Sequence, residues 1–241
     1  MALPTYDASS ENTPAAAVSS STHSHTFAAS AAAVVNVRIR DATTAPTVST
    51  VTVGGNSASF VNGDTNFGDR RVEQWVCPNP PTGAQDVIVT LSGSTSVGLN
   101  VGCLSYTGCH ATTPAGASLT NESVSNDVTP TVTFSTTYTD SLVVDCAYHT
   151  DDATYSASGA GQTQRENRIF ISGNDVVGSS QKSAATAGSY TMEWTAGTSG
   201  AWVTSAMELR SPASESIGTG MGGRISKVPL RPRIFAPGHA R

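Results

Sequence analysis

Charged side chains are scarce in this chain of 241 residues. They make up 13% of it, against about 25% in an average soluble protein. Ser, Thr, Asn and Gly must therefore supply most of its solubility, a composition typical of β-proteins that work outside cells or in durable assemblies. Aromatic residues are also few, at 6%. We expect most of them to anchor a core.

Long hydrophobic runs are missing too. No stretch approaches the roughly 18 apolar residues of a membrane helix, so we expect no membrane partner. The first seven residues carry neither the positive charge nor the apolar run of a signal peptide. We therefore expect the chain to be made in a reducing cytoplasm.

The four cysteines lack the CxxC spacing of redox and zinc motifs. We expect free thiols, buried as small hydrophobic groups. A bridge between Cys103 and Cys109 is the alternative.

Signatures of catalysis and of cofactor binding are absent as well. The run 218–223, Gly-Thr-Gly-Met-Gly-Gly, matches the dinucleotide-binding fingerprint only loosely. That fingerprint requires a strand before it and a helix after it, and neither is predicted here. No GxSxG elbow occurs. The five histidines are scattered, and we expect them to face solvent; His23 and His25 alternate on one candidate strand without a visible third metal ligand. We expect no catalytic residue, no cofactor and no metal site.

What the chain does have is a strand, a proline-rich corner and a second strand within residues 72–91. Pro80 and Pro81 remove two backbone donors and hold the residues before them extended, so the corner is neither helix nor central sheet. Val87, Val89 and Leu91 then alternate with Asp86, Ile88 and Thr90. This pattern predicts one sheet folding onto another.

Other segments extend the β pattern. Gly54-Gly55-Asn56 predicts a tight hairpin between residues 47–53 and 57–61, because glycine accepts the positive φ of a primed turn. Residues 34–39 are rich in β-branched side chains, which favours strand over the helix that the preceding alanines would allow. Further strands are expected at 5–8, 98–106, 132–134, 142–149 and 168–171, and a closing pair at 190–194 and 202–209.

About ten short strands without a convincing helix predict an all-β, antiparallel two-sheet sandwich, and favour a jelly roll. Loops are expected at 62–69, 112–126, 151–164 and 175–188. We divide the chain into an N-terminal edge strand and mobile connection that belong to the body (1–24), the sandwich (25–210), and a Gly/Ser linker with an extended arm (211–241).

The final segment differs from the body in charge. From Pro212 onward the net charge is 5 − 1 = +4, which leaves 8 − 17 = −9 for residues 1–211. Its basic residues are interleaved with apolar ones, so docking on an acidic partner is favoured over nucleic acid. We expect these residues to make the contact: Lys227, Leu230, Arg231, Arg233, Ile234 and Phe235.

Several motifs also resemble a known domain. They are Thr5-Tyr-Asp-Ala-Ser-Ser, Val51-Thr-Val-Gly-Gly, Val72-Glu-Gln-Trp-Val-Cys-Pro-Asn-Pro-Pro-Thr-Gly, Val87-Ile-Val-Thr-Leu-Ser-Gly and Leu104-Ser-Tyr-Thr-Gly. Together they resemble the jelly-roll domain of structural and tail-associated proteins of tailed bacteriophages, over about residues 4–210. The closing residues 233–241 also look like phage gene products. This resemblance implies a virion component, made in the host cytoplasm, with no catalytic residues to carry over. The resemblance does not decide whether the protein belongs to the phage head or to the tail.

Two hypotheses follow. The first is a capsid-decorating or head-associated virion subunit, a homo-oligomer whose arm grips the major capsid protein or a neighbouring virion subunit. The second is a tail-associated, carbohydrate-binding module that recognises a surface glycan. Its candidate ligand face consists of Trp75, Tyr155, Trp194 and Trp202.

Overall fold

The computed structural model describes residues 2–14, 18–66, 68–150, 154–171 and 175–212. These residues form seventeen β-strands and no helix, as the sequence predicts for an all-β protein. The first nine strands are β1 (Thr5–Asn12), β2 (Ser20–Phe27), β3 (Ala31–Arg40), β4 (Val48–Val53), β5 (Asn56–Ser57), β6 (Ser59–Asn66), β7 (Arg70–Pro78), β8 (Gly83–Leu91) and β9 (Gly98–Thr107). The other eight are β10 (Ala115–Asp127), β11 (Thr131–Ser135), β12 (Ser141–Thr150), β13 (Tyr155–Ala157), β14 (Gln162–Ile171), β15 (Asp175–Ala184), β16 (Ser189–Ala196) and β17 (Gly200–Leu209).

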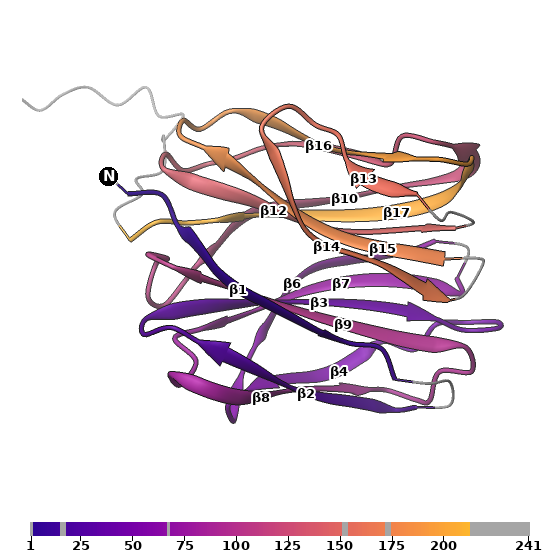
Figure 1. Ribbon diagram of the computed structural model, residues 1–241, viewed down its shortest axis with the longest axis horizontal. Helices are drawn as coiled ribbons and strands as arrows, with labels where there is room; N and C mark the ends of the chain where they lie inside the picture. Colours follow the sequence, from indigo (N-terminus) through magenta and orange to yellow (C-terminus); the bar gives the residue numbers. More distant parts are fainter. Residues whose placement is uncertain (1, 15–17, 67, 151–153, 172–174, 213–241) are drawn as a thin grey trace, which may run out of the picture.

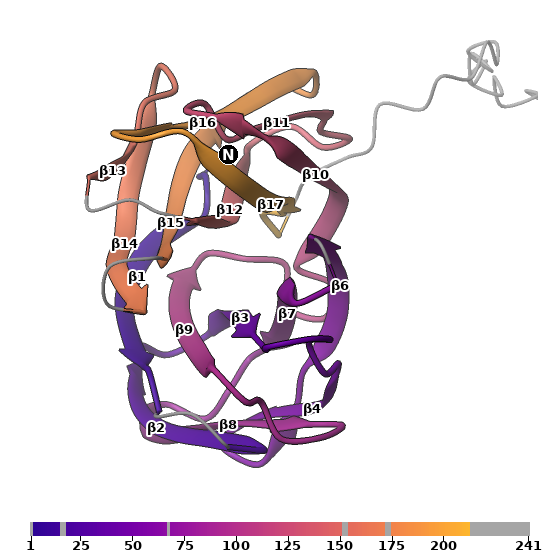
Figure 2. The ribbon, with the colours of Figure 1, turned by 90° about the vertical axis from the view of Figure 1, so that its right-hand side faces the viewer.

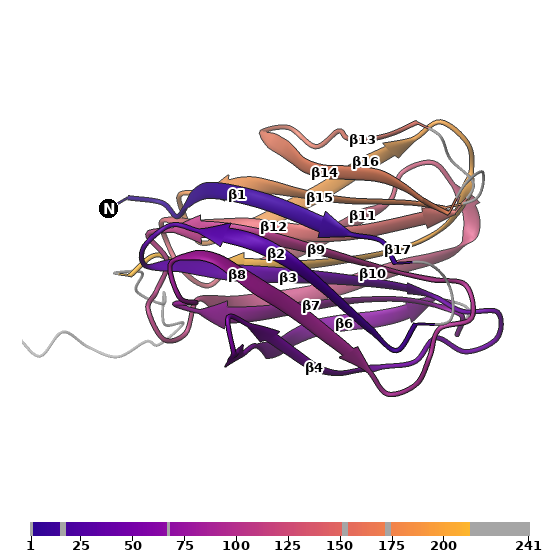
Figure 3. The same cartoon turned by 60° about the horizontal axis from the view of Figure 1, so that its bottom comes forward.

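The strands form four antiparallel sheets stacked as layers (Figure 1). We expected two sheets. The outer layers are the small sheets β2-β8-β4-β5 and β11-β16-β13, and the inner layers are the five-stranded sheets β1-β9-β3-β7-β6 and β10-β17-β12-β15-β14. Figure 3 brings one outer sheet, with β2, β8 and β4, to the front of the stack.

The N-terminal and C-terminal halves of the chain repeat one strand order. Read in chain order, β10 to β13 take the places of β1 to β4, and β14 to β17 take those of β6 to β9, in both the larger and the smaller sheet. Among the described strands only β5 lacks a counterpart. The body therefore consists of two sandwiches of the same topology, a repeat that no sequence motif indicated.

The halves meet through their larger sheets (Figure 2). On one side, β6 lies against β10 and β17; we call this the β6/β10 seam. On the other side, β14 reaches β1, where Arg168 pairs with Glu11 at 2.6 Å; we call this the β1/β14 seam. Because β6 corresponds to β14 and β10 to β1, exchanging the halves converts one seam into the other. The two seams therefore occupy corresponding places in the repeated strand order.

The proline corner and the glycine hairpin, predicted separately, pack against each other. Gly54 and Gly55 have φ of 57° and 82°, and the two strands that they join pair as Val53 with Asn56. A Cβ on Gly54 would lie 2.7 Å from Pro81 Cδ. The corner itself carries the chain from β7 in one sheet to β8 in the other. The prediction of sheet folding onto sheet is confirmed.

Apolar side chains fill all three spaces between the layers. Val35 and Val37 of β3 point into the N-terminal sandwich, and Val34 points toward the other half. This double coverage explains why nine of the ten residues in β3 are buried. In the C-terminal sandwich, Trp194 is fully buried and stacks on Tyr155.

Three predicted loops turned out to be largely strand. Residues 62–66 continue β6, 115–127 form β10 and 175–184 form β15. The loop predicted at 151–164 contains β13 and the first residues of β14, so the strand predicted at 168–171 begins earlier, at Gln162. Small polar residues dominate these stretches and give them little β propensity, so tertiary pairing decides their conformation. At the N-terminus, β2 already begins at Ser20, inside the segment that we expected to be a mobile connection.

The closing strands are also arranged differently from our expectation. β16 and β17 are strands, as predicted, but they do not pair: β16 lies in the small outer sheet and β17 in the large inner sheet. The turn between them therefore links two layers. All four cysteines are buried and free, as expected, so no Cys103–Cys109 bridge forms.

Candidate functional site

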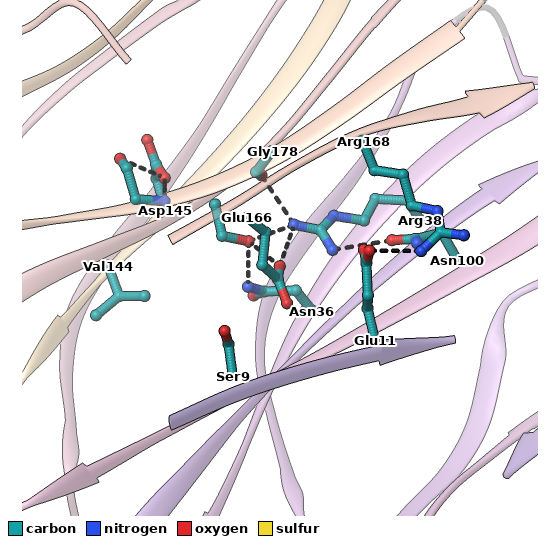
Figure 4. A network of polar contacts seen from close by, with 12 residues as sticks. Ser9, Glu11, Asn36, Arg38, Asn100, Val144, Asp145, Glu166, Arg168 and Gly178 are labelled. Atoms are coloured by element: carbon teal, nitrogen blue, oxygen red, sulfur yellow. Dashed lines mark hydrogen bonds and ion pairs between the residues drawn. The ribbon is translucent and has the colours of Figure 1, made fainter. Parts of the chain in front are cut away.

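A buried guanidinium lies between the two halves (Figure 4). Arg38 of β3 is fully buried and donates hydrogen bonds to Asn100 Oδ1 at 3.0 Å, Glu166 Oε2 at 3.1 Å and the Gly178 carbonyl at 2.8 Å. Ser179 Oγ is a further close partner. The charge is thus paired and hydrogen-bonded, as a buried ion requires.

The sequence makes room for the acidic partner. Glu166 projects from β14 toward β9, where a Cβ on Gly102 would collide with its carboxylate oxygens. Its Oε2 also accepts a hydrogen bond from Ser179 Oγ at 2.6 Å. Only glycine therefore fits at position 102 with Glu166 in this position.

Amides and hydroxyls extend this polar belt across the interface. Asn36 Nδ2 donates to Ser179 Oγ at 2.8 Å, and Gln74 Nε2 donates to Asn36 Oδ1 at 3.1 Å. Ser205 Oγ lies 2.7 Å from Gln74 Oε1 and 2.6 Å from Asn62 Oδ1. This network crosses the interface and fixes how the halves sit on each other, while Arg38 Nε and Glu166 Oε1 remain without a hydrogen-bond partner. We assign the belt to structure.

A second polar cluster joins β1, β2 and β9 around His25, which is only 2% exposed. Its Nδ1 lies 2.7 Å from Ser10 Oγ, and its Nε2 lies 3.0 Å from Ser105 Oγ. Ser105 Oγ donates to Asp7 Oδ2 at 2.8 Å. Since the Ser105 proton goes to Asp7, Nε2 must donate to Ser105, and Nδ1 is left to accept from Ser10.

This chain of contacts places a hydroxyl beside a base, which the sequence had not revealed. The order differs from that of a catalytic triad, because the carboxylate contacts Ser105 and not the imidazole. Burial, and then the proximity of His23, lower the pKa of His25 to about 4. A base this weak is poorly matched to proton transfer near pH 7. The cluster supports a structural role.

The expectation that the histidines face solvent is wrong for His25. The odd-numbered residues from Ser21 to Phe27 point to the inner face of β2. His25 therefore shares a face with the apolar Phe27, and this shared face was the sequence signal that His25 is buried. His149 is buried as well, and its Nε2 lies 3.1 Å from the Asp127 carbonyl oxygen.

An open groove lies at one end of the β6/β10 seam. It has a volume of about 340 Å³ and is lined by residues 59–61, 76, 78, 112–116 and 118; we call it the Phe60 groove. Phe60 is 53% exposed, and its ring meets Trp75 edge to face with centroids 5.4 Å apart. It is the largest side chain on the groove and among the most exposed apolar ones in the described residues.

The chain leaves the body next to this groove. The Arg210 amide donates to the Pro114 carbonyl at 2.7 Å, and the His110 amide donates to the Arg210 carbonyl at 2.8 Å. Arg210 also reaches Thr113 through its guanidinium. The last described residues are thus fixed to the wall of the groove.

The four residues of the predicted ligand face are not brought together. Trp194 and Tyr155 stack 4.6 Å apart inside the C-terminal sandwich, and Trp202 is 3% exposed. The indole N–H groups of Trp194 and Trp202 donate to Asp145 and Asp127. These three rings act as core anchors, and only Trp75 is half-buried at the surface, with its N–H bound to Glu73 Oε2 at 3.0 Å.

The predicted arm contacts lie outside the described residues: Lys227, Leu230, Arg231, Arg233, Ile234 and Phe235. Within the described part of the chain, no three His, Cys, Asp or Glu side chains are grouped to hold a metal ion. The same residues contain no helix able to cross a membrane.

No protein-family model, curated protein or solved structure matches the chain.

Proposed function

We propose that this protein is a structural subunit of a bacteriophage virion, decorating the capsid or otherwise associated with the head. One observation carries the proposal: an acidic body is followed by a basic C-terminal segment rich in apolar residues, and the two are joined beside an open apolar groove. Residues 1–211 carry a net charge of −9 and the remainder +4. In this proposal residues 211–241 attach the subunit to the major capsid protein or to a neighbouring copy.

The strand order supports a finer description of the fold. In the larger sheet of each half, the first strand of that half pairs with the last strand, and the last strand also pairs with the third. In the facing, smaller sheet, the second strand pairs with the last but one. A jelly roll winds its strands in this way. We therefore propose two jelly rolls packed through their larger sheets, in place of the single one expected.

The packing of the body fits a structural role. Buried titratable groups such as His25, Asp145 and Glu208 are held by several hydrogen bonds each, which ties them to the scaffold. Four layers with three filled interfaces give a stiff block. This supports a non-catalytic subunit that acts in the virion after release from the host cytoplasm.

Truncation at Ser211 tests the proposal. The shortened chain should keep the β-rich circular dichroism spectrum and the cooperative melting of the full chain, but it should be missing from purified particles when subunits are quantified by mass spectrometry. A matched variant with Arg231→Gln and Arg233→Gln separates the charge contribution from the apolar one. Unchanged occupancy of the truncated chain would refute attachment through this segment.

A carbohydrate-binding, tail-associated module is the second candidate. Exposed Phe60 against half-buried Trp75 is the one aromatic pair on the described surface that could stack on a sugar ring. A glycan array probed with the full chain and with Phe60→Ala tests it. Glycan binding that Phe60→Ala abolishes would favour this candidate, and the absence of any hit would remove it.

A further inference from the structure

We propose that, before assembly, the Phe60 groove is occupied by residues 224–235 of the same chain. This inference rests on the proposed function, since it concerns the segment that we take to be the assembly arm. It goes further by giving that segment a docking site on the body.

The two seams differ in how far the body's own side chains cover them. At the β1/β14 seam, Arg165 lies 3.8 Å over the ring of Tyr6, and Arg168 pairs with Glu11, so side chains of the body cover that edge. The corresponding β6/β10 seam instead leaves Phe60 exposed over a hollow of about 340 Å³. Corresponding edges of the two halves thus differ: side chains of the body cover one edge and leave the other exposed.

The described part of the chain ends beside the groove. Ser211 is fully buried, and Arg210 is bonded to Thr113 and Pro114 on the groove wall. Residues 213–223 then form a Gly/Ser-rich connection. A connection of this length spans roughly 18 Å on average and about 36 Å when extended. Residues 224–235 therefore start within reach of the groove, at a high effective concentration.

The chemistry of the segment matches its site. It carries Ile225, Val228, Leu230, Ile234 and Phe235 among four basic residues. A hollow of this size accommodates a few side chains and not a folded domain, and Phe60 offers a ring against which an aromatic side chain can pack. The opposite net charges of the body and the segment favour their encounter, while the groove, whose lining carries no charged side chain, offers apolar contacts.

Pro229 and Pro232 fit this manner of binding. Proline restricts the backbone, so these two residues would lower the entropy that the segment loses on binding. We assign Ile234 and Phe235 as the anchors, because they are adjacent large apolar residues flanked by Arg233.

Photo-crosslinking of the free, full-length protein tests the inference. p-Benzoylphenylalanine in place of Phe60 should crosslink to a peptide within residues 224–241, identified by mass spectrometry. The same photo-reactive residue in place of Ile88, 37% exposed on the outer sheet, is the control and should not. The double variant Ile234→Asp, Phe235→Asp should reduce the Phe60 crosslink about tenfold or more, as expected for the loss of buried anchors, while Thr219→Asp should leave it unchanged.

Mixing isotopically light and heavy protein before irradiation identifies the chain that supplies the segment. Crosslinks confined to light–light and heavy–heavy products support occupation by the same chain. Mixed products, crosslinks to another part of the body, or no crosslink from position 60 would overturn the inference. These results concern the free protein, so they stand whatever the truncated chain does in particles.

Discussion

Arg38 and Glu166 lie 128 residues apart in the sequence, yet Arg38 Nη2 is 3.1 Å from Glu166 Oε2 across the interface between the two halves. Their side chains are 0% and 5% exposed. An ion pair buried this deeply, with further hydrogen bonds on both partners, fixes the relative position of the two larger sheets.

Replacing Arg38 alone should therefore be severe. Arg38→Met leaves the Glu166 carboxylate buried without its cation, and we expect a loss of about 3–5 kcal/mol in the free energy of unfolding. Urea denaturation followed by tryptophan fluorescence measures it. The double variant Arg38→Met, Glu166→Gln should recover part of the loss, because it removes the uncompensated charge. A single variant as stable as the parent would show that the pair does not hold the halves together.

A second prediction concerns Gly178 of β15, which lies under the Trp194 ring. A Cβ at this position would collide with the indole, so Gly178→Ala should lower the free energy of unfolding by about 1–3 kcal/mol. Gly93→Ala is the matched control, since no atom lies within 4 Å of its added Cβ and its φ is not positive. The control should change stability by less than about 0.5 kcal/mol. Equal effects of the two substitutions would contradict this packing.

The third prediction follows from the lowered pKa of His25. The imidazole has a pKa of about 4 in the folded protein, against 6.5 as the ordinary value, so the unfolded chain binds more protons between these pH values. The stability that neutral His25 provides is complete above pH 6.5 and is lost as the pH falls toward 4. We expect this contribution to be about 2 kcal/mol, allowing for partial solvent screening.

The measurement is the difference between the parent and His25→Gln across this pH range. Gln accepts from Ser10 and donates to Ser105 as the neutral imidazole does, but it does not titrate. Burial raises the pKa of Asp145 to about 7, so Asp145 lowers the stability of the protein as the pH rises over the same range. Subtracting the variant from the parent removes this effect. A difference that does not change with pH would show that His25 is not protected from protonation.

The fourth prediction concerns the thiols. Burial raises the pKa of Cys77 to about 11 and those of Cys109 and Cys146 to about 12, and it raises that of Cys103 as well. Since the thiolate is the reactive form, no thiol should react with Ellman's reagent at pH 8 in the native protein, and all four should react in guanidinium chloride. Rapid reaction of one thiol in the native protein would reveal local opening of its strand.

Much of the secondary structure could be read from residue patterns. Residues 34–39 and 142–148 carry enough β-branched or alternating apolar side chains to identify β3 and β12. β10 and β15 could not be found in this way, because their Ser, Thr and Gly residues resemble loop composition. Such strands exist because a neighbouring strand satisfies their backbone hydrogen bonds, which is a tertiary property.

Some residues of the candidate sites could likewise be identified from the sequence, and others could not. Trp75 and the proline corner stood out from the sequence, whereas Phe60 did not, because nothing in its neighbours shows that it lies on an open seam. The buried positions of Trp194 and Trp202 agree with the expectation that most aromatic residues anchor a core. The cluster around His25 depends on which strands become neighbours.

The sequence by itself determined that the chain is all-β, where its tight hairpin and proline corner lie, and that an acidic body precedes a basic tail. These properties depend on local backbone preference and on composition. Only the tertiary structure decided that there are four layers, that two halves repeat one topology, and that one of two equivalent seams remains open. Those features arise from pairings between strands that are far apart in the sequence, such as β3 with β9 and β11 with β16, and no local pattern encodes them.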